Sequence, residues 1–73
     1  MAAVIDEKQA IEIATKDASL VYRDLTIYET SALLIEDNWL VDFEIKDPNL
    51  QGGGPHYVIS GTTGEILRKR YEQ

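Results

Sequence analysis

The only histidine of the chain, His56, is the residue best suited to acid–base chemistry near neutral pH. It follows Pro55 at the start of a predicted strand, and carboxylates such as Asp42 or Glu44 could lie nearby on a neighbouring strand. A general base also needs a nucleophile or a substrate pocket, and the sequence indicates neither. We therefore expect a structural or solvent-exposed role for His56. A small ligand-binding or acid–base enzyme, with His56 in a cleft between helix and sheet, is the alternative hypothesis.

The other groups that could do chemistry have simpler explanations. The chain has no cysteine, which excludes disulfides and thiolate metal sites, and one histidine with scattered carboxylates lacks the spacing of zinc or calcium sites. Ser60, Thr62 and Thr63 have no paired base in the sequence and are typical turn residues. We expect no catalytic residue, no cofactor and no metal.

Residues 47–55 contain two prolines and three consecutive glycines, Gly52, Gly53 and Gly54, and predict a mobile loop. The glycines are not a phosphate-binding loop, because neither Lys-Ser nor Lys-Thr follows them and no helix begins there. The loop is either a flexible edge that closes on a partner or a tolerated surface insertion.

Length and charge limit the possible functions. A chain of 73 residues forms a single domain, residues 1–73, and buries only roughly 60% of its unfolded surface. With 13 acidic and 7 basic residues the net charge is -6, which disfavours nucleic acid and anionic membranes and favours a basic or neutral protein partner. No segment approaches the length of a membrane span and the N-terminus lacks a signal-peptide pattern, so we expect a cytoplasmic protein.

The N-terminal segment predicts a helix that begins at residue 6 or 7. Asp6 can accept a hydrogen bond from the backbone N–H of Gln9 while the Gln9 side chain reaches back, with Ile5 as the staple residue. Small and apolar residues then recur at spacings of three and four, at Ala10, Ile11, Ala14, Ala18 and Val21. We expect this face to pack on a sheet and the helix to end between Leu20 and Asp24.

The rest of the chain predicts an antiparallel meander. Residues 25–35 form one bent strand or two short strands, and residues 36–38 form a turn. The clearest strand covers residues 39–46, with Trp39, Val41, Phe43 and Ile45 facing the helix. Residues 56–60 and 65–71 form a hairpin around the turn Gly61-Thr62-Thr63-Gly64. The predicted fold class is α+β, with one N-terminal helix packed on a three- or four-stranded antiparallel meander sheet.

The sheet face away from the helix is the expected binding surface. If two or more of the four tyrosines lie on this face beside Leu34, Leu40 and Val58, they form an exposed patch of the type that marks protein contacts. Basic residues 68–70 would be split across the sheet, with Arg68 and Arg70 on the face of Ile66, and would protect an edge strand rather than dock a ligand. The candidate partner-binding residues are Tyr28, Leu34, Leu40, Gly52, Gly53, Gly54, His56 and Val58.

Two families resemble this pattern. Residues 5–14 are similar to the opening helix of PepSY-type domains, and residues 57–60 with Thr63-Gly64-Glu65-Ile66-Leu67 are similar to their closing hairpin. The strand that starts at Trp39-Leu40-Val41, followed by a Gly-Gly-Pro loop and a hairpin, resembles small cystatin-like proteins grouped with NTF2-fold immunity proteins. Both resemblances imply a helix packed on an antiparallel sheet, and the first implies binding and restraint of partner proteins, proteases in particular.

These observations predict a non-enzymatic protein-binding module of an inhibitory or immunity type. The partner would dock on the open sheet face or add a strand to an exposed edge, and self-association through the same surface is the simplest case. A structural segment of a larger polypeptide is a further alternative.

Overall fold

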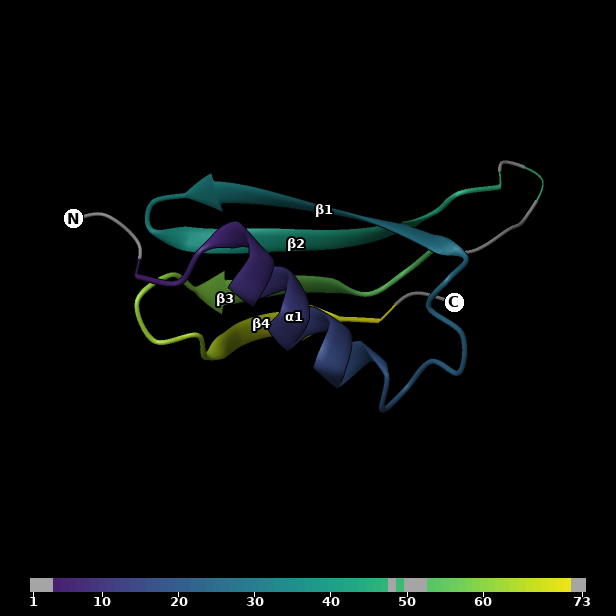
Figure 1. Cartoon of the computed structure of the whole chain (residues 1–73), viewed down its shortest axis with the longest axis horizontal. Coiled ribbons are helices and arrows are strands. Elements are labelled where there is room, and N and C mark those ends of the chain that lie inside the picture. Colours follow the sequence, from purple (N-terminus) through teal and green to yellow (C-terminus); the bar gives the residue numbers. More distant parts are fainter. Residues whose placement is uncertain (1–3, 48, 50–52, 72–73) are drawn as a thin grey trace.

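The computed structural model describes residues 4–47, 49 and 53–71, which form one helix and four strands in the order predicted. The elements are α1 (Glu7–Ala18), β1 (Tyr28–Ile35), β2 (Asn38–Ile45), β3 (His56–Ser60) and β4 (Ile66–Arg70). The strands follow the order β1-β2-β3-β4 in one antiparallel sheet, and α1 lies across one face of it (Figure 1). The predicted α+β class is confirmed, and the ambiguous segment 25–35 contains a single strand.

The helix begins as its capping residues predict and ends earlier than expected. The Asp6 carboxylate accepts a hydrogen bond from the Gln9 N–H at 2.8 Å, and the Gln9 side chain accepts one from the Asp6 N–H at 3.0 Å. Ala10, Ala14 and Ala18 are fully buried, but α1 ends at Ala18. Val21 was expected on the buried face and is 54% exposed, because the helix ends before it although the spacing of apolar residues continues.

A two-residue turn joins β1 to β2 and sets their register. Glu36 and Asp37 have positive φ values of 49° and 66°, as in the tight hairpin turns whose twist matches that of the sheet. This turn pairs Ile35 with Asn38 and Leu34 with Trp39. Because residues directly opposite each other share a face, the turn decides which side chains of β1 meet the helix.

The covered face carries the core. Val41, Phe43, Tyr57 and Ile59 are buried against the three alanines of α1, and Trp39 is half-buried beside them. The Trp39 indole N–H donates to the Ile5 carbonyl at 2.7 Å. The prediction that Trp39, Val41 and Phe43 face the helix is thus confirmed.

The glycine loop is held by the core at its C-terminal end. Gly54 and Pro55 are buried, and the Phe43 N–H donates to the Pro55 carbonyl at 3.1 Å. A Cβ atom on Gly54 would overlap the backbone of Phe43, so this position requires glycine for close packing rather than for mobility. Gly52 lies outside the described residues.

The basic cluster is divided between the two faces as predicted, but a bulge in β4 changes which face carries Ile66. Val58 lies opposite Arg68, but Ile59 lies opposite Ile66, so Leu67 is an extra residue in β4. Ile66 therefore packs on the helix side, whereas Arg68 lies on the other side with Val58. The expectation that Arg68 and Arg70 share a face with Ile66 is wrong, because one inserted residue reverses the alternation.

We expect the replacement Asp6→Ala to lower the free energy of unfolding by about 1 kcal/mol, because the Gln9 N–H loses its capping acceptor. Urea denaturation followed by circular dichroism measures this change. Asp6→Asn is the matched control, since asparagine caps helices about as well as aspartate. Equal loss in both variants would show that charge, and not capping, is what Asp6 contributes.

Candidate functional site

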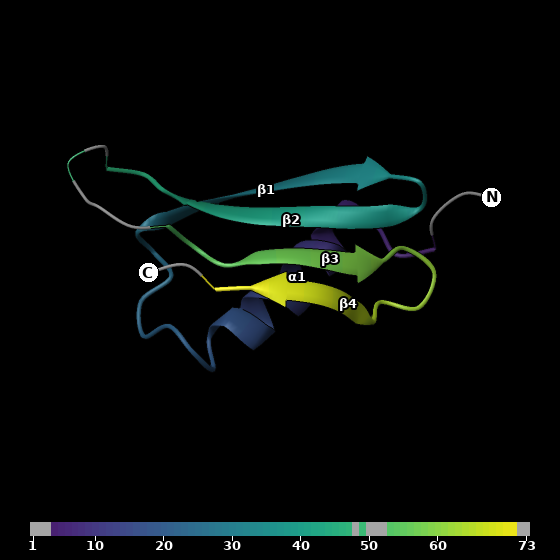
Figure 2. The same cartoon turned by 180° about the vertical axis from the view of Figure 1, so that it is seen from behind.

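The sheet face away from α1, here called the open face, has no described element over it (Figure 2). Side chains that lie directly opposite one another across the strands form transverse rows on this face. The strand register decides which side chains share a row. Along each strand, the residues of these rows alternate with residues that face the core. Two of these rows, one aliphatic and one charged, have side chains that could form a binding site.

The first row is aliphatic. Leu33, Leu40 and Val58 lie opposite one another on three neighbouring strands, and Ile35 lies two residues beyond Leu33 on the same face. Leu33 is 59% exposed and Ile35 is 44% exposed, while Leu40 and Val58 are half-buried. We call these four residues the aliphatic row. They form a continuous apolar surface that crosses β1, β2 and β3.

The second row contains the only histidine. Asp42, His56 and Arg70 lie opposite one another on β2, β3 and β4, and His56 Nδ1 lies 2.7 Å from Asp42 Oδ1. The side chains of His56 and Asp42 are 26% and 43% exposed. The contact is an ion pair when the imidazole is protonated and a hydrogen bond when it is neutral. The pair could therefore exchange a proton or recognise a polar group.

A depression of about 240 Å³ lies beside this pair. Its lining consists of Tyr57 together with six residues of the open face, Leu40, Asp42, His56, Val58, Arg68 and Arg70. The alternative hypothesis placed His56 in a cleft between helix and sheet, and this position is wrong. Because Tyr57 faces the helix, its neighbour His56 must point to the opposite face.

The tyrosines also lie elsewhere than the binding prediction required. Tyr22, Tyr28, Tyr57 and Tyr71 form a chain of edge-to-face ring contacts with Phe43 on the helix side, with ring centroids 5.9 to 6.4 Å apart. Tyr28 belongs to the surroundings of the core, so it does not contribute to an aromatic patch on the open face.

The remaining candidates divide between the two faces. Leu34 lies opposite Trp39 on the helix side and is 43% exposed. Leu40, Val58 and His56 do lie together on the open face. Gly53 lies in the loop that precedes β3 and belongs to none of the strands.

Sequence reasoning missed a polar cluster at the C-terminal end of α1. The Asp17 carboxylate accepts hydrogen bonds from Tyr57 at 2.9 Å, from Tyr71 at 2.6 Å and from Lys69 at 3.4 Å. We call these four residues the Asp17 cluster. Asp17 is 40 to 54 residues away from its partners in the chain, so no local pattern predicts the contacts. The cluster holds β4 and the residue after it to the helix.

These contacts shift the pKa values of Asp17 and Tyr57. The hydrogen bond from Tyr71 is the largest cause that holds the pKa of Asp17 below its usual range, and the contacts from Tyr57 and Lys69 act in the same direction. Burial and the adjacent Asp17 carboxylate raise the pKa of Tyr57, so this hydroxyl keeps its proton at alkaline pH values where a free tyrosine loses it.

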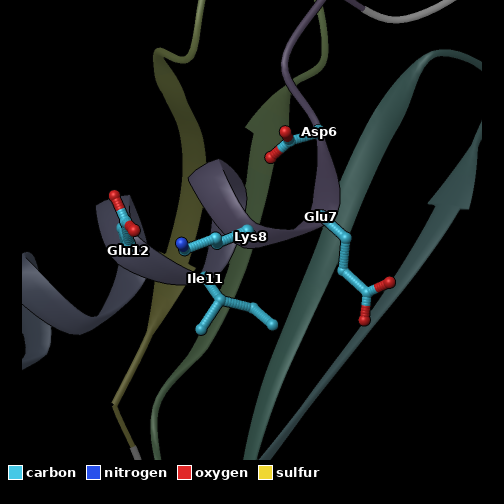
Figure 3. A pocket seen from close by; sticks show the side chains of 5 residues that line it. All are labelled: Asp6, Glu7, Lys8, Ile11 and Glu12. Carbon is cyan, nitrogen blue, oxygen red and sulfur yellow. The ribbon is translucent and has the colours of Figure 1, made fainter.

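Two further hollows lie elsewhere on the described surface. One, of about 570 Å³, borders the first turns of α1, and Figure 3 shows that its lining side chains Glu7 and Glu12 point away from each other. The other, of about 480 Å³, borders the N-terminal end of β1 beside Glu29 and Glu44. In the described part of the chain, no three histidine or acidic side chains come together as metal ligands.

Comparison of the chain with protein families, curated proteins and solved structures finds no significant match in any of the three. Within residues 4–47, 49 and 53–71, no helix has the length and apolarity that crossing a membrane requires.

We expect Tyr71→Phe to raise the pKa of Asp17, because it removes the strongest of the hydrogen bonds that stabilise the carboxylate. The same change should lower the free energy of unfolding at neutral pH by about 1 kcal/mol. An NMR titration of the side-chain carboxyl carbons measures the first effect. Asp24 serves as an internal control, because its own lowered pKa depends on Thr26 and should not change.

The Asp17 cluster also predicts how stability depends on pH. The folded-state pKa of Asp17 lies below its unfolded value, so the carboxylate stabilises the fold above the unfolded pKa. This contribution disappears as the pH falls through the folded pKa. Denaturation at several acidic pH values should show a smaller loss of stability in Tyr71→Phe than in the parent chain, and equal losses would contradict the assigned role of Tyr71.

Proposed function

We propose that this protein is a non-enzymatic protein-binding module that docks a partner through its sheet. The aliphatic row is the observation that carries the proposal. Leu33, Ile35, Leu40 and Val58 form one apolar strip, although the open face has no described element to cover it. A short chain uses most of its large apolar residues in the core, so four aliphatic side chains on the outer face need another explanation. Contact with a second protein provides one.

The polar groups around the strip support the same proposal. Asp42, His56 and Arg70 border the aliphatic row on one side, and Arg68 lies opposite Val58 at its end on β4. An apolar centre with a charged rim is the usual composition of a protein interface. The rim would orient the partner, and the aliphatic centre would supply most of the binding energy.

The chemistry of the chain favours a protein over other partners. A net charge of -6 opposes binding to phosphate backbones and to anionic lipid. The resemblance to PepSY-type and cystatin-like proteins favours an inhibitory or immunity-type role, in which occupation of the partner's surface is the whole mechanism. A cytoplasmic location remains a prediction.

We expect Leu40→Ala to weaken binding of the partner about tenfold, as truncation of a central apolar side chain typically does. The immobilised chain captures proteins from an extract of the cells that make it, and titration of the captured protein against both forms measures the affinity. Leu20→Ala is the matched control, because Leu20 is 81% exposed and lies outside the sheet. Capture that is insensitive to Leu40, or no capture by the parent chain, would contradict the proposal.

A ligand-binding or acid–base role for His56 is the second candidate function, and its contact with Asp42 at 2.7 Å favours it. The two functions differ in what His56→Ala should do. If the protein is a docking module, His56 is a rim residue and His56→Ala should retain the fold and change partner affinity by less than about threefold. Loss of a catalytic or small-molecule binding activity in folded His56→Ala would favour the second candidate. Titration of the ring by NMR, with and without Asp42→Asn, tests the coupling of the pair.

A further inference from the structure

The two edges of the sheet differ in how well they are protected. β1 and β4 are the edge strands, and no described segment lies beyond β1 in either view of the molecule (Figures 1 and 2). β4 carries a bulge and three consecutive basic residues, and Lys69 and Tyr71 connect its end to α1 through Asp17. Bulges and edge charges are what natural sheets use to prevent the addition of another strand. β1 has no bulge, no lysine and no proline.

The backbone of β1 offers hydrogen-bonding groups in a defined pattern. The Lys46 N–H donates to the Ile27 carbonyl at 2.9 Å, and the Phe43 N–H donates away from β1 to Pro55. Since antiparallel pairs alternate along the ladder, Glu29, Ser31, Leu33 and Ile35 direct their backbone groups toward β2. Thr30, Ala32 and Leu34 therefore direct their N–H and C=O groups to the outer edge, whereas the Tyr28 N–H donates to the Leu25 carbonyl at 3.2 Å.

The side chains of β1 are apolar on both faces at its C-terminal end. Leu33 and Ile35 extend the aliphatic row on the open face, and Leu34 is 43% exposed on the helix side. A strand placed beside β1 would thus find apolar contacts above and below the sheet. Exposed edges of this kind accept extended peptides, with the backbone supplying affinity and the side chains supplying selectivity.

The charge of the β1–β2 hairpin defines the chemistry of that peptide. Residues 28–45 contain five acidic residues and no basic residue, namely Glu29, Glu36, Asp37, Asp42 and Glu44. Glu29 lies opposite Glu44, and Glu36 and Asp37 form the turn at the other end. The apolar part of the edge is therefore bordered by carboxylates at both ends.

We propose that β1 receives an extended segment of another protein as a fifth strand, and that this segment is aliphatic in its centre with lysine or arginine at its ends. The inference rests on the proposed docking function and specifies its partner. A second copy of this chain fits less well. Antiparallel pairing of two β1 strands would bring Glu29 of one copy close to the turn carboxylates of the other, between molecules of net charge -6.

Hydrogen exchange of the backbone amides tests the strand addition. The probe is a nine-residue peptide that alternates valine and threonine between terminal lysines. Binding should slow exchange at Thr30, Ala32 and Leu34, and change it least at Ser31 and Leu33, whose amides already face β2. Uniform protection, or protection centred on Leu40 and Val58, would overturn the inference.

The charge of the partner is tested with a second peptide in which glutamates replace the lysines. The lysine peptide should bind about tenfold more tightly at low salt, and the difference should shrink as the ionic strength rises. Equal affinities, or no binding of the lysine peptide at about 1 mM, would overturn the proposed partner chemistry. Sedimentation of the chain alone detects self-association, and a dimer that is lost on peptide addition would assign the edge to a second copy instead.

Thr30→Pro tests the role of the edge backbone. The Thr30 side chain is exposed and its N–H faces outward, so proline should remove one donor for the added strand while the ladder to β2 persists. We expect peptide affinity to fall about tenfold in Thr30→Pro and to be unchanged in Thr30→Ala, which retains the N–H. Unchanged affinity in folded Thr30→Pro would contradict strand addition. If this variant does not fold, the hydrogen exchange of the parent chain with the lysine peptide is the deciding test.

Failure of this inference can be distinguished from failure of the docking function. Leu40→Ala changes the open face at a central strand and leaves the backbone of β1 intact. A captured partner whose affinity depends on Leu40 but not on Thr30→Pro would retain the docking function and exclude β1 as its site. A partner sensitive to neither variant would contradict both.

Discussion

The packing of one short helix on one face of the sheet is the contact on which the rest of this structure depends. Three alanines allow α1 to approach Val41, Phe43, Tyr57 and Ile59 closely enough to bury them. A helix of 12 residues can cover only one face, so the chain has a core on one side and an open surface on the other. Packing of the core therefore does not account for the aliphatic side chains on the open face.

Contacts at both ends of the helix hold it to the sheet. At the N-terminal end, the Ile5 N–H donates to Gly61 and the Ile5 carbonyl accepts from Trp39, both at 2.7 Å. At the C-terminal end, Asp17 accepts from Tyr57 and Tyr71. A carboxylate near a helix C-terminus is unfavourable for the helix dipole, and these hydrogen bonds offset that cost. The second set of contacts also ties β4 to the helix, whereas the ring contacts of β1 join Tyr28 to Tyr22 and Phe43.

The charges also differ between the two edges of the sheet. The β1–β2 hairpin is acidic, and Arg68, Lys69 and Arg70 make β4 basic. One edge is therefore protected by a bulge, by like charges and by its connection to α1, while the other combines apolar side chains with carboxylates at its ends. The proposed selection of a partner by shape and charge rests on this difference between the edges.

Local patterns in the sequence determined the elements of this protein. Asp6 and Gln9 specify the start of α1, the strict alternation from Trp39 to Ile45 specifies β2, and the glycines around Thr62 indicate the last turn, because capping, pleat and turn chemistry act over a few residues. Only the tertiary structure decided which side chains meet. The bulge at Leu67 changed which face of β4 carries Ile66, and the tyrosine rings packed together on the helix side. Asp17 formed hydrogen bonds with residues that lie 40 to 54 positions away in the chain. Register and packing set these contacts, and both depend on the whole sheet rather than on neighbours in the chain.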